Sequence, residues 1–191
     1  MKKINSIKLL STLFLLALTL SSTPTSSAAP KASTIEGLIT AKGKISQNHS
    51  DAKLKYDLSK SIPMGGVHNS YWVACKVWDT PVAAEYAIHS MEHGAIWIVY
   101  NSSLKPAEVN LIKNLAKNDP YVLVTKVDNA KDPITVSAWG FQIKAKKAND
   151  VRIPLFIKTY KNSKTTPELG APCTPGLTDP ALAAKPQAIK R

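Results

Sequence analysis

The stretch PVAAEYAIHSMEHGAIWIVY, residues 81–100, predicts a helix followed directly by a buried strand. Asp79 or Thr80 is placed to cap the helix, and a proline suits its first position. Gly94 supplies the left-handed residue that ends it. The apolar run AIWIVY, residues 95–100, then has the length and composition of a buried strand. A helix and a strand in direct succession indicate a domain that mixes both element types.

Further elements are predicted on both sides of this stretch. Helices are expected over residues 106–117 and from Asn149 or Asp150 to Tyr160, and short strands over 72–78, 121–127 and 134–139. The order of these elements predicts a single α+β domain with a small mixed or antiparallel sheet of about four strands and three helices. We expect this globular domain to span residues 61–177, after an extended lead-in over 30–60 and before a disordered tail over 178–191.

Residues 1–29 have the pattern of a secretory signal peptide. Three lysines precede an apolar run of about a dozen residues, and SSAAP at 26–30 gives a small-residue cleavage zone. The sequence therefore predicts a secreted or extracytoplasmic (periplasmic) protein. An uncleaved N-terminal anchor is the alternative, and no later segment is long and apolar enough to span a membrane.

The whole sequence has a formal net charge of +12, and the chain stays basic after removal of the predicted signal peptide. Its lysines are spread out and form no stripe on one element, as nucleic-acid binding would require. We expect no nucleic-acid partner and an association with the cell envelope.

Two cysteines are present, Cys75 and Cys173. In an exported protein an even pair usually forms a disulfide. A thiolate metal site or a redox pair is the alternative, but there is no C-x-x-C spacing.

The four histidines, at positions 49, 68, 89 and 93, are the strongest candidates for chemistry. His89 and His93 are four residues apart on one face of the predicted helix, where both imidazoles can reach one ion. His68 would supply a third imidazole from the loop before the helix, and Glu92 a fourth ligand or an orienting carboxylate. His49, Met64 and Met91 are additional candidate ligands.

This donor set predicts a transition-metal site, with copper preferred because of the thioether groups and zinc as the second choice. Tyr86, beside the histidines on the helix, and Trp139 are expected at the edge of the site. Two alternatives stay open. The histidines could be hydrogen-bonded supports in a non-catalytic envelope domain, or the H-x-x-E-H string at 89–93 could serve a small metal-dependent hydrolase. We favour binding over catalysis.

Five ordered motifs resemble a bacterial family, the domain of unknown function 3105 family: GGVHN (65–69), WVACKVW (72–78), HSMEHGAIW (89–97), SAWG (137–140) and TPELGAPC (166–173). The likeness covers about residues 36–177. It implies an exported or membrane-anchored protein and a Cys75–Cys173 pair, but no activity. His49 also falls where the family carries a histidine. Met64 departs from the family pattern, as does Phe141, where an arginine is more usual.

Overall fold

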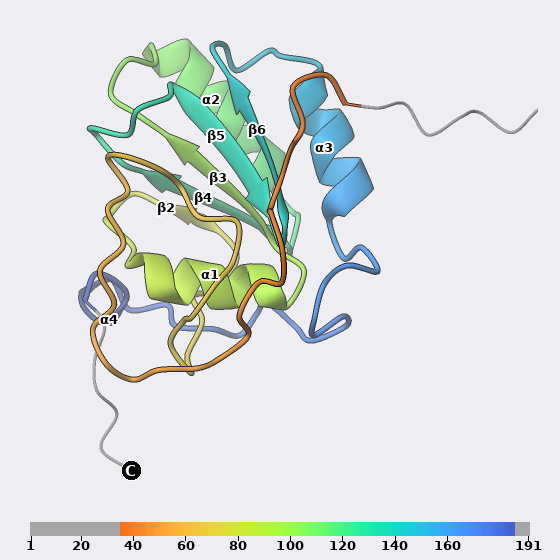
Figure 1. The fold of residues 1–191 in the computed structure, drawn as a ribbon. Helices are drawn as coiled ribbons and strands as arrows, with labels where there is room; N and C mark the ends of the chain where they lie inside the picture. Colours follow the sequence, from red (N-terminus) through yellow and green to blue (C-terminus); the bar gives the residue numbers. More distant parts are fainter. Residues whose placement is uncertain (1–34, 186–191) are drawn as a thin grey trace, which may run out of the picture. The chain divides into compact units, whose positions relative to one another are not determined.

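The sheet is built around β3 (Ile96–Tyr100), which pairs in parallel with β4 (Val122–Lys126) and antiparallel with β5 (Ile134–Ala138). The computed structural model describes residues 35–185. Within this range the strand order is β1-β6-β5-β3-β4-β2, so the sheet is mixed (Figure 1). The remaining strands are β1 (Ile39–Thr40), β2 (Val77–Trp78) and β6 (Phe141–Ala145). The helices are α1 (Ala84–Glu92), α2 (Pro106–Ala116), α3 (Arg152–Tyr160) and α4 (Pro180–Ala183).

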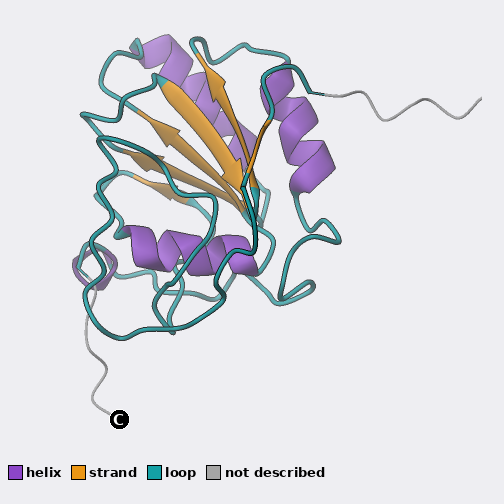
Figure 2. Ribbon diagram, in the orientation of Figure 1, coloured by secondary structure: helices purple, strands orange, loops and turns teal. Residues whose placement is uncertain are grey.

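Both faces of the sheet are covered, which explains why every residue of β3 is buried. Side chains alternate along a strand. Ile96 and Ile98 therefore join a core cluster with α2 and α3, while Trp97 and Val99 join a second cluster with α1. Figure 2 shows the helices placed around the sheet in this way.

The direction of the crossover connections accounts for the placement of α1 and α2. The chain passes from β2 over β4 to β3 through α1, and then back to β4 through α2. Right-handed crossovers in opposite directions put their helices on opposite faces of a sheet. α1 therefore packs on the face of the sheet that carries Trp97 and Val99. The site described below lies on the side of α1 away from the sheet.

Within the described part of the chain the sheet has six strands rather than about four. β6 was not predicted because FQIKA carries a lysine and a glutamine, yet it pairs with β5 along its whole length. β1 is a two-residue strand from the predicted lead-in and pairs with β6 through Ile39 and Thr40. Residues 35–60 are thus part of the folded unit rather than a segment outside it.

α1 begins later than the capping signals at Asp79 and Thr80 predict. Its N-cap residue is Ala83, which has no side-chain cap. The Ala83 amide instead donates a hydrogen bond to the carbonyl of Ala183, at 2.8 Å. This tertiary contact fixes the helix start, while Gly94 ends the helix with the predicted positive φ of 101°.

The C-terminal segment differs from the predicted disordered tail as far as residue 185. α4 forms after Asp179, whose side chain accepts a hydrogen bond from the Ala181 amide. Ala183 is fully buried against the α1 side of the core. Residues 186–191 and the predicted signal peptide at 1–29 lie outside the described residues.

Every residue of α1 is buried, including the polar ones. Two segments distant in sequence cover the face that the sheet leaves open. The lead-in forms a bridge between His49 and His68, and the C-terminal segment forms a bridge between Val73 and Leu177. Polar side chains on α1 are therefore enclosed between three parts of the chain.

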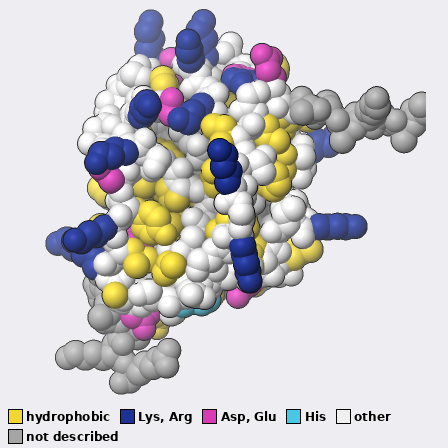
Figure 3. Space-filling view, viewed as in Figure 1, with side chains coloured by type: hydrophobic (Ala, Val, Ile, Leu, Met, Phe, Trp, Pro, Cys, Tyr) yellow, Lys and Arg dark blue, Asp and Glu magenta, His cyan; other side chains and the backbone are white. Residues whose placement is uncertain are grey.

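Cys75 and Cys173 form a disulfide across a separation of 98 residues. This pairing agrees with the prediction, and it is compatible with an extracytoplasmic protein. Across residues 35–185, none of the helices has the length and hydrophobicity that crossing a membrane requires. Figure 3 shows lysine and arginine side chains spread over the visible face rather than gathered in a stripe.

Candidate metal centre

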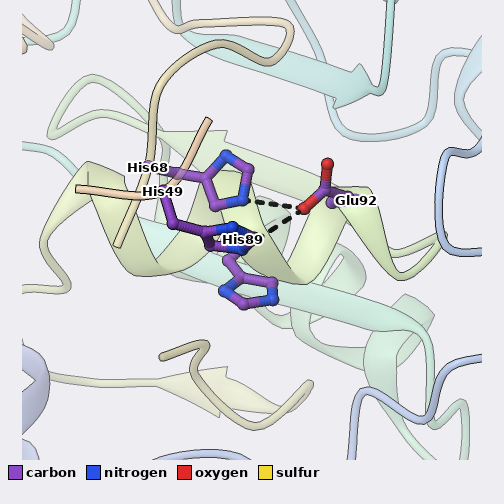
Figure 4. A group of neighbouring side chains, drawn as sticks. All are labelled: His49, His68, His89 and Glu92. Carbon is purple, nitrogen blue, oxygen red and sulfur yellow. Dashed lines mark ion pairs between the residues drawn. The ribbon is translucent and has the colours of Figure 1, made fainter. Parts of the chain in front are cut away.

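Four side chains meet on the outer side of α1, and we call them the inner group: His49, His68, His89 and Glu92. One ligand atom from each lies within 4.8 Å of the others. His89 and Glu92 come from α1, His68 from the loop before it, and His49 from the lead-in. Figure 4 shows the three rings and the carboxylate around a common space.

Backbone carbonyls fix the orientation of the buried rings. The Nδ1 atom of His68 lies 2.7 Å from the carbonyl oxygen of Gly66, and the Nδ1 of His89 lies 2.7 Å from that of Asn69. A carbonyl can only accept, so each Nδ1 is the donor. In the neutral ring the other nitrogen, Nε2, then carries a lone pair. A metal-binding histidine usually has such a hydrogen bond, from the ring nitrogen that does not bind the metal to a carbonyl or carboxylate.

The contact between His68 and Glu92 is the most informative in the group. His68 Nε2 lies 2.8 Å from Glu92 Oε2, close enough for an ion pair. Both atoms are buried, yet neither has a hydrogen-bond partner of acceptable geometry among residues 35–185. Two ligand atoms on one ion, each bonded at about 2.0–2.1 Å, lie roughly 2.9–3.4 Å apart. The observed separation of the two atoms is thus close to that of two ligands of a shared cation.

Burial keeps the imidazole of His89 neutral at neutral pH. His68 and Glu92 are almost fully buried, and His89 is 5% exposed. Burial lowers the pKa of His89 from 6.5 to about 4; neighbouring imidazoles add to this, and the hydrogen bond to Asn69 opposes it. The Nε2 lone pair of His89 is therefore available at neutral pH.

His49 is the least buried member, with a side chain 39% exposed. Its Nε2 lies 3.7 Å from Glu92 Oε2, and its ring contacts the rings of His68 and His89 at centroid distances of 4.5 and 4.9 Å. The backbone bridge to His68 brings it there, with the Ser50 amide donating to the His68 carbonyl at 2.7 Å.

His93 differs from the expectation that it joins His68 and Glu92. It is the C-cap residue of α1, and its Nδ1 bonds to the Pro172 carbonyl at 3.0 Å. This turns Nε2 toward Glu168, with 3.0 Å between Nε2 and Oε2. His89, His93 and Glu168 form a second set of ligand atoms within 4.8 Å, which we call the outer group.

A cleft of about 550 Å³ opens over the outer group and is lined by Trp72 and Pro172 as well. The Trp72 ring contacts His89 and His93 at centroid distances of 5.4 and 4.6 Å. Its indole nitrogen donates to the Cys173 carbonyl, which connects the cleft wall to the disulfide.

The other predicted side chains lie in different surroundings. Trp139 packs edge-on against His68 at 5.9 Å between ring centroids, at the edge of the inner group. Tyr86 lies in the core cluster on the α1 side, and its hydroxyl donates to the Lys185 carbonyl. Met91 is fully buried in the same cluster, because its position on α1 faces the sheet. Met64 is half-buried, and its carbonyl accepts from the Gly140 amide.

A family model described as "Protein of unknown function (DUF3105)" matches residues 48–175. The chain belongs to this family. The matched DUF3105 region begins next to His49 and ends just after Cys173, so it contains both ligand groups and the disulfide. Neither the curated proteins nor the solved structures gave a significant match.

Two residues that line the cleft in the DUF3105 region, Glu168 and Trp72, were not predicted as site residues from the sequence. Glu168 lies far from Glu92 along the chain, in a proline-rich segment with no ligand spacing, although the Glu168 amide donates to the Glu92 carbonyl. Trp72 was assigned to a strand. The only available signal was indirect, since both residues lie within the motifs that resemble the family.

Proposed function

We propose that this protein binds one divalent transition-metal ion outside the cytoplasm through His49, His68, His89 and Glu92. The observation that carries the proposal is the buried, non-hydrogen-bonded pair of His68 Nε2 and Glu92 Oε2 at 2.8 Å. A buried carboxylate facing a buried imidazole nitrogen is unfavourable unless a proton or a metal cation lies between the two atoms, and a metal ion would meet this need.

The donor set favours a divalent ion. Met91 is buried toward the sheet, so the argument from its thioether no longer supports copper. Three imidazoles and one carboxylate suit Cu²⁺ and Zn²⁺, and divalent copper binds more tightly to such ligands in general. Copper therefore remains the first choice and zinc the second. The predicted signal peptide and the disulfide support a site that works in an oxidising compartment.

The test is thermal unfolding and calorimetric titration with Cu²⁺ or Zn²⁺, using protein expressed from the full-length sequence without a polyhistidine tag. At a free ion concentration of 100 times Kd, binding to the folded state alone adds about 2.7 kcal/mol of stability. For a chain of this size that raises Tm by roughly 5–10 °C. We expect one ion per chain.

Glu92→Gln is the deciding variant, because it keeps the shape of the side chain and removes its charge. Loss of a supporting residue alone typically costs 10–100-fold in affinity, so loss of this ligand should cost at least about 100-fold. Glu85→Gln is the matched control. Glu85 is also a buried glutamate of α1, but it bonds to the Leu54 amide. It should lower Tm and leave the affinity unchanged.

Wild-type protein whose Tm does not respond to either ion or to a chelator would contradict the proposal. The histidines would then be hydrogen-bonded supports of α1, and His68→Ala would lower Tm equally with and without chelator.

A further inference from the structure

His89 is the one residue that both ligand groups share. Its ring contacts those of His49, His68 and His93, with centroid distances of 4.9, 4.9 and 4.7 Å. Because Nδ1 is held by the Asn69 carbonyl, only Nε2 can bind an ion. One lone pair binds one ion, so the two groups are alternative positions for a single ion.

The outer group has the same chemical features as the inner group. His93 is almost fully buried, its Nδ1 donates to Pro172, and its Nε2 faces the carboxylate of Glu168 at 3.0 Å. An imidazole nitrogen and a carboxylate oxygen thus face each other here as they do in the inner group, and both atom types can bind a metal ion. The difference lies in exposure, since the Glu168 side chain is 45% exposed whereas that of Glu92 is 2% exposed.

The cleft determines which of the two groups an incoming ion would meet first. His89, His93 and Glu168 line it, together with His49. His68 and Glu92, the buried pair of the inner group, do not line it. An ion that arrives from this cleft meets the outer group before it reaches Glu92.

We propose that the outer group is the access site of the metal centre, and that the ion passes to the inner group by ligand exchange at His89. This inference rests on the proposed function. His89 Nε2 stays bound throughout, the bonds to His93 and Glu168 break, and bonds to His68, Glu92 and His49 form. The ion keeps its charge. The inner group has one more imidazole and less contact with water, so the ion resides there at equilibrium.

The test compares the rate of metal association with the equilibrium affinity for the metal in the same variants. Zn²⁺ binding is followed by stopped-flow competition with a chromogenic chelator in wild type, Glu168→Gln and His93→Gln. Removing the negative charge of Glu168 from the cleft should slow association of the cation about tenfold. The equilibrium affinity should stay within about threefold, because no inner ligand is changed. Glu108→Gln removes an equal charge outside the cleft and should leave the rate unchanged.

The outcomes separate the two proposals. Wild-type association rates in both outer variants would overturn the access site and leave the inner site intact. So would a loss of equilibrium affinity as large as that of Glu92→Gln, because Glu168 would then be a resident ligand. Two ions bound at once would overturn the shared role of His89. Absence of any binding by the wild type would contradict the proposed function itself.

Discussion

His89 is buried among three other imidazoles, and this position determines the pH at which it takes up a proton. In the unfolded chain the pKa of the ring is near 6.5, but in the folded chain it is about 4. Between these values the unfolded state binds more protons, so folding stability falls as the pH is lowered. The contribution of His89 is fully present above about pH 6.5 and is lost by about pH 4.

We therefore expect chelator-treated wild type to lose on the order of 2–3 kcal/mol from this group between pH 7 and pH 4. His89→Gln keeps a donor for the Asn69 carbonyl and does not titrate, so its stability should fall less over the same range. Urea unfolding at several pH values measures the difference. Equal slopes for the two proteins would show that His89 is not the titrating group.

At the scale of single residues the sequence predicted that the histidines and Glu92 cluster, but not how they divide between the two groups. The spacing of His89 and His93 on one helix suggested a shared ion, yet the two rings take different partners. The reason is a hydrogen bond between distant segments, from the His93 side chain to the Pro172 carbonyl, which no spacing reveals. His49 likewise reaches the site through a backbone bridge to His68, which belongs to a different loop.

The segment over residues 166–177 is the element that completes the cleft, and the disulfide holds it. Cys173 follows Pro172, whose carbonyl orients His93, and the Cys173 carbonyl accepts from Trp72. Closing a loop of about 100 residues stabilises a fold by up to about 4–5 kcal/mol through the entropy of the unfolded chain.

We expect the double variant Cys75→Ser, Cys173→Ser to lower Tm by roughly 5–15 °C. It should also slow metal association, because the outer group loses its support, while the inner ligands remain in place. Wild type under reducing conditions should show the same two changes. An unchanged association rate would mean that the outer group is held without the disulfide.

Prediction of elements was reliable where a pattern is local. β3, β4, β5 and α2 follow from apolar runs and from a proline at a helix start, and all lie within a residue or two of their predicted bounds. β1, β6 and the start of α1 depend on tertiary pairing instead. Ala83 bonds to Ala183 and Ile39 pairs with Gln142, and neither contact leaves a periodic signal in the sequence.

At the scale of the whole described unit, the ligands connect parts of the chain that differ in how firmly they are packed. The lead-in is half-exposed over much of its length and meets the site through the bridge between His49 and His68, whereas α1 is enclosed. A metal ion bound by His49 from the lead-in and by Glu92 from α1 would therefore fix the lead-in to the core. Local opening of such a segment is suppressed by any ligand that requires it closed.

The lysines of the lead-in make this testable by limited proteolysis. Lys42, Lys44, Lys53 and Lys55 are exposed and flank His49, so trypsin reports on the opening of this segment. We expect Zn²⁺ at 100 times Kd to slow cleavage here by about tenfold or more, since protection follows the free energy of opening. In His49→Ala the ion still has three ligands, but the lead-in is no longer one of them. With zinc, that variant should keep most of its gain in Tm but lose its protection from trypsin. Equal protection of the wild type and His49→Ala would exclude His49 as a ligand.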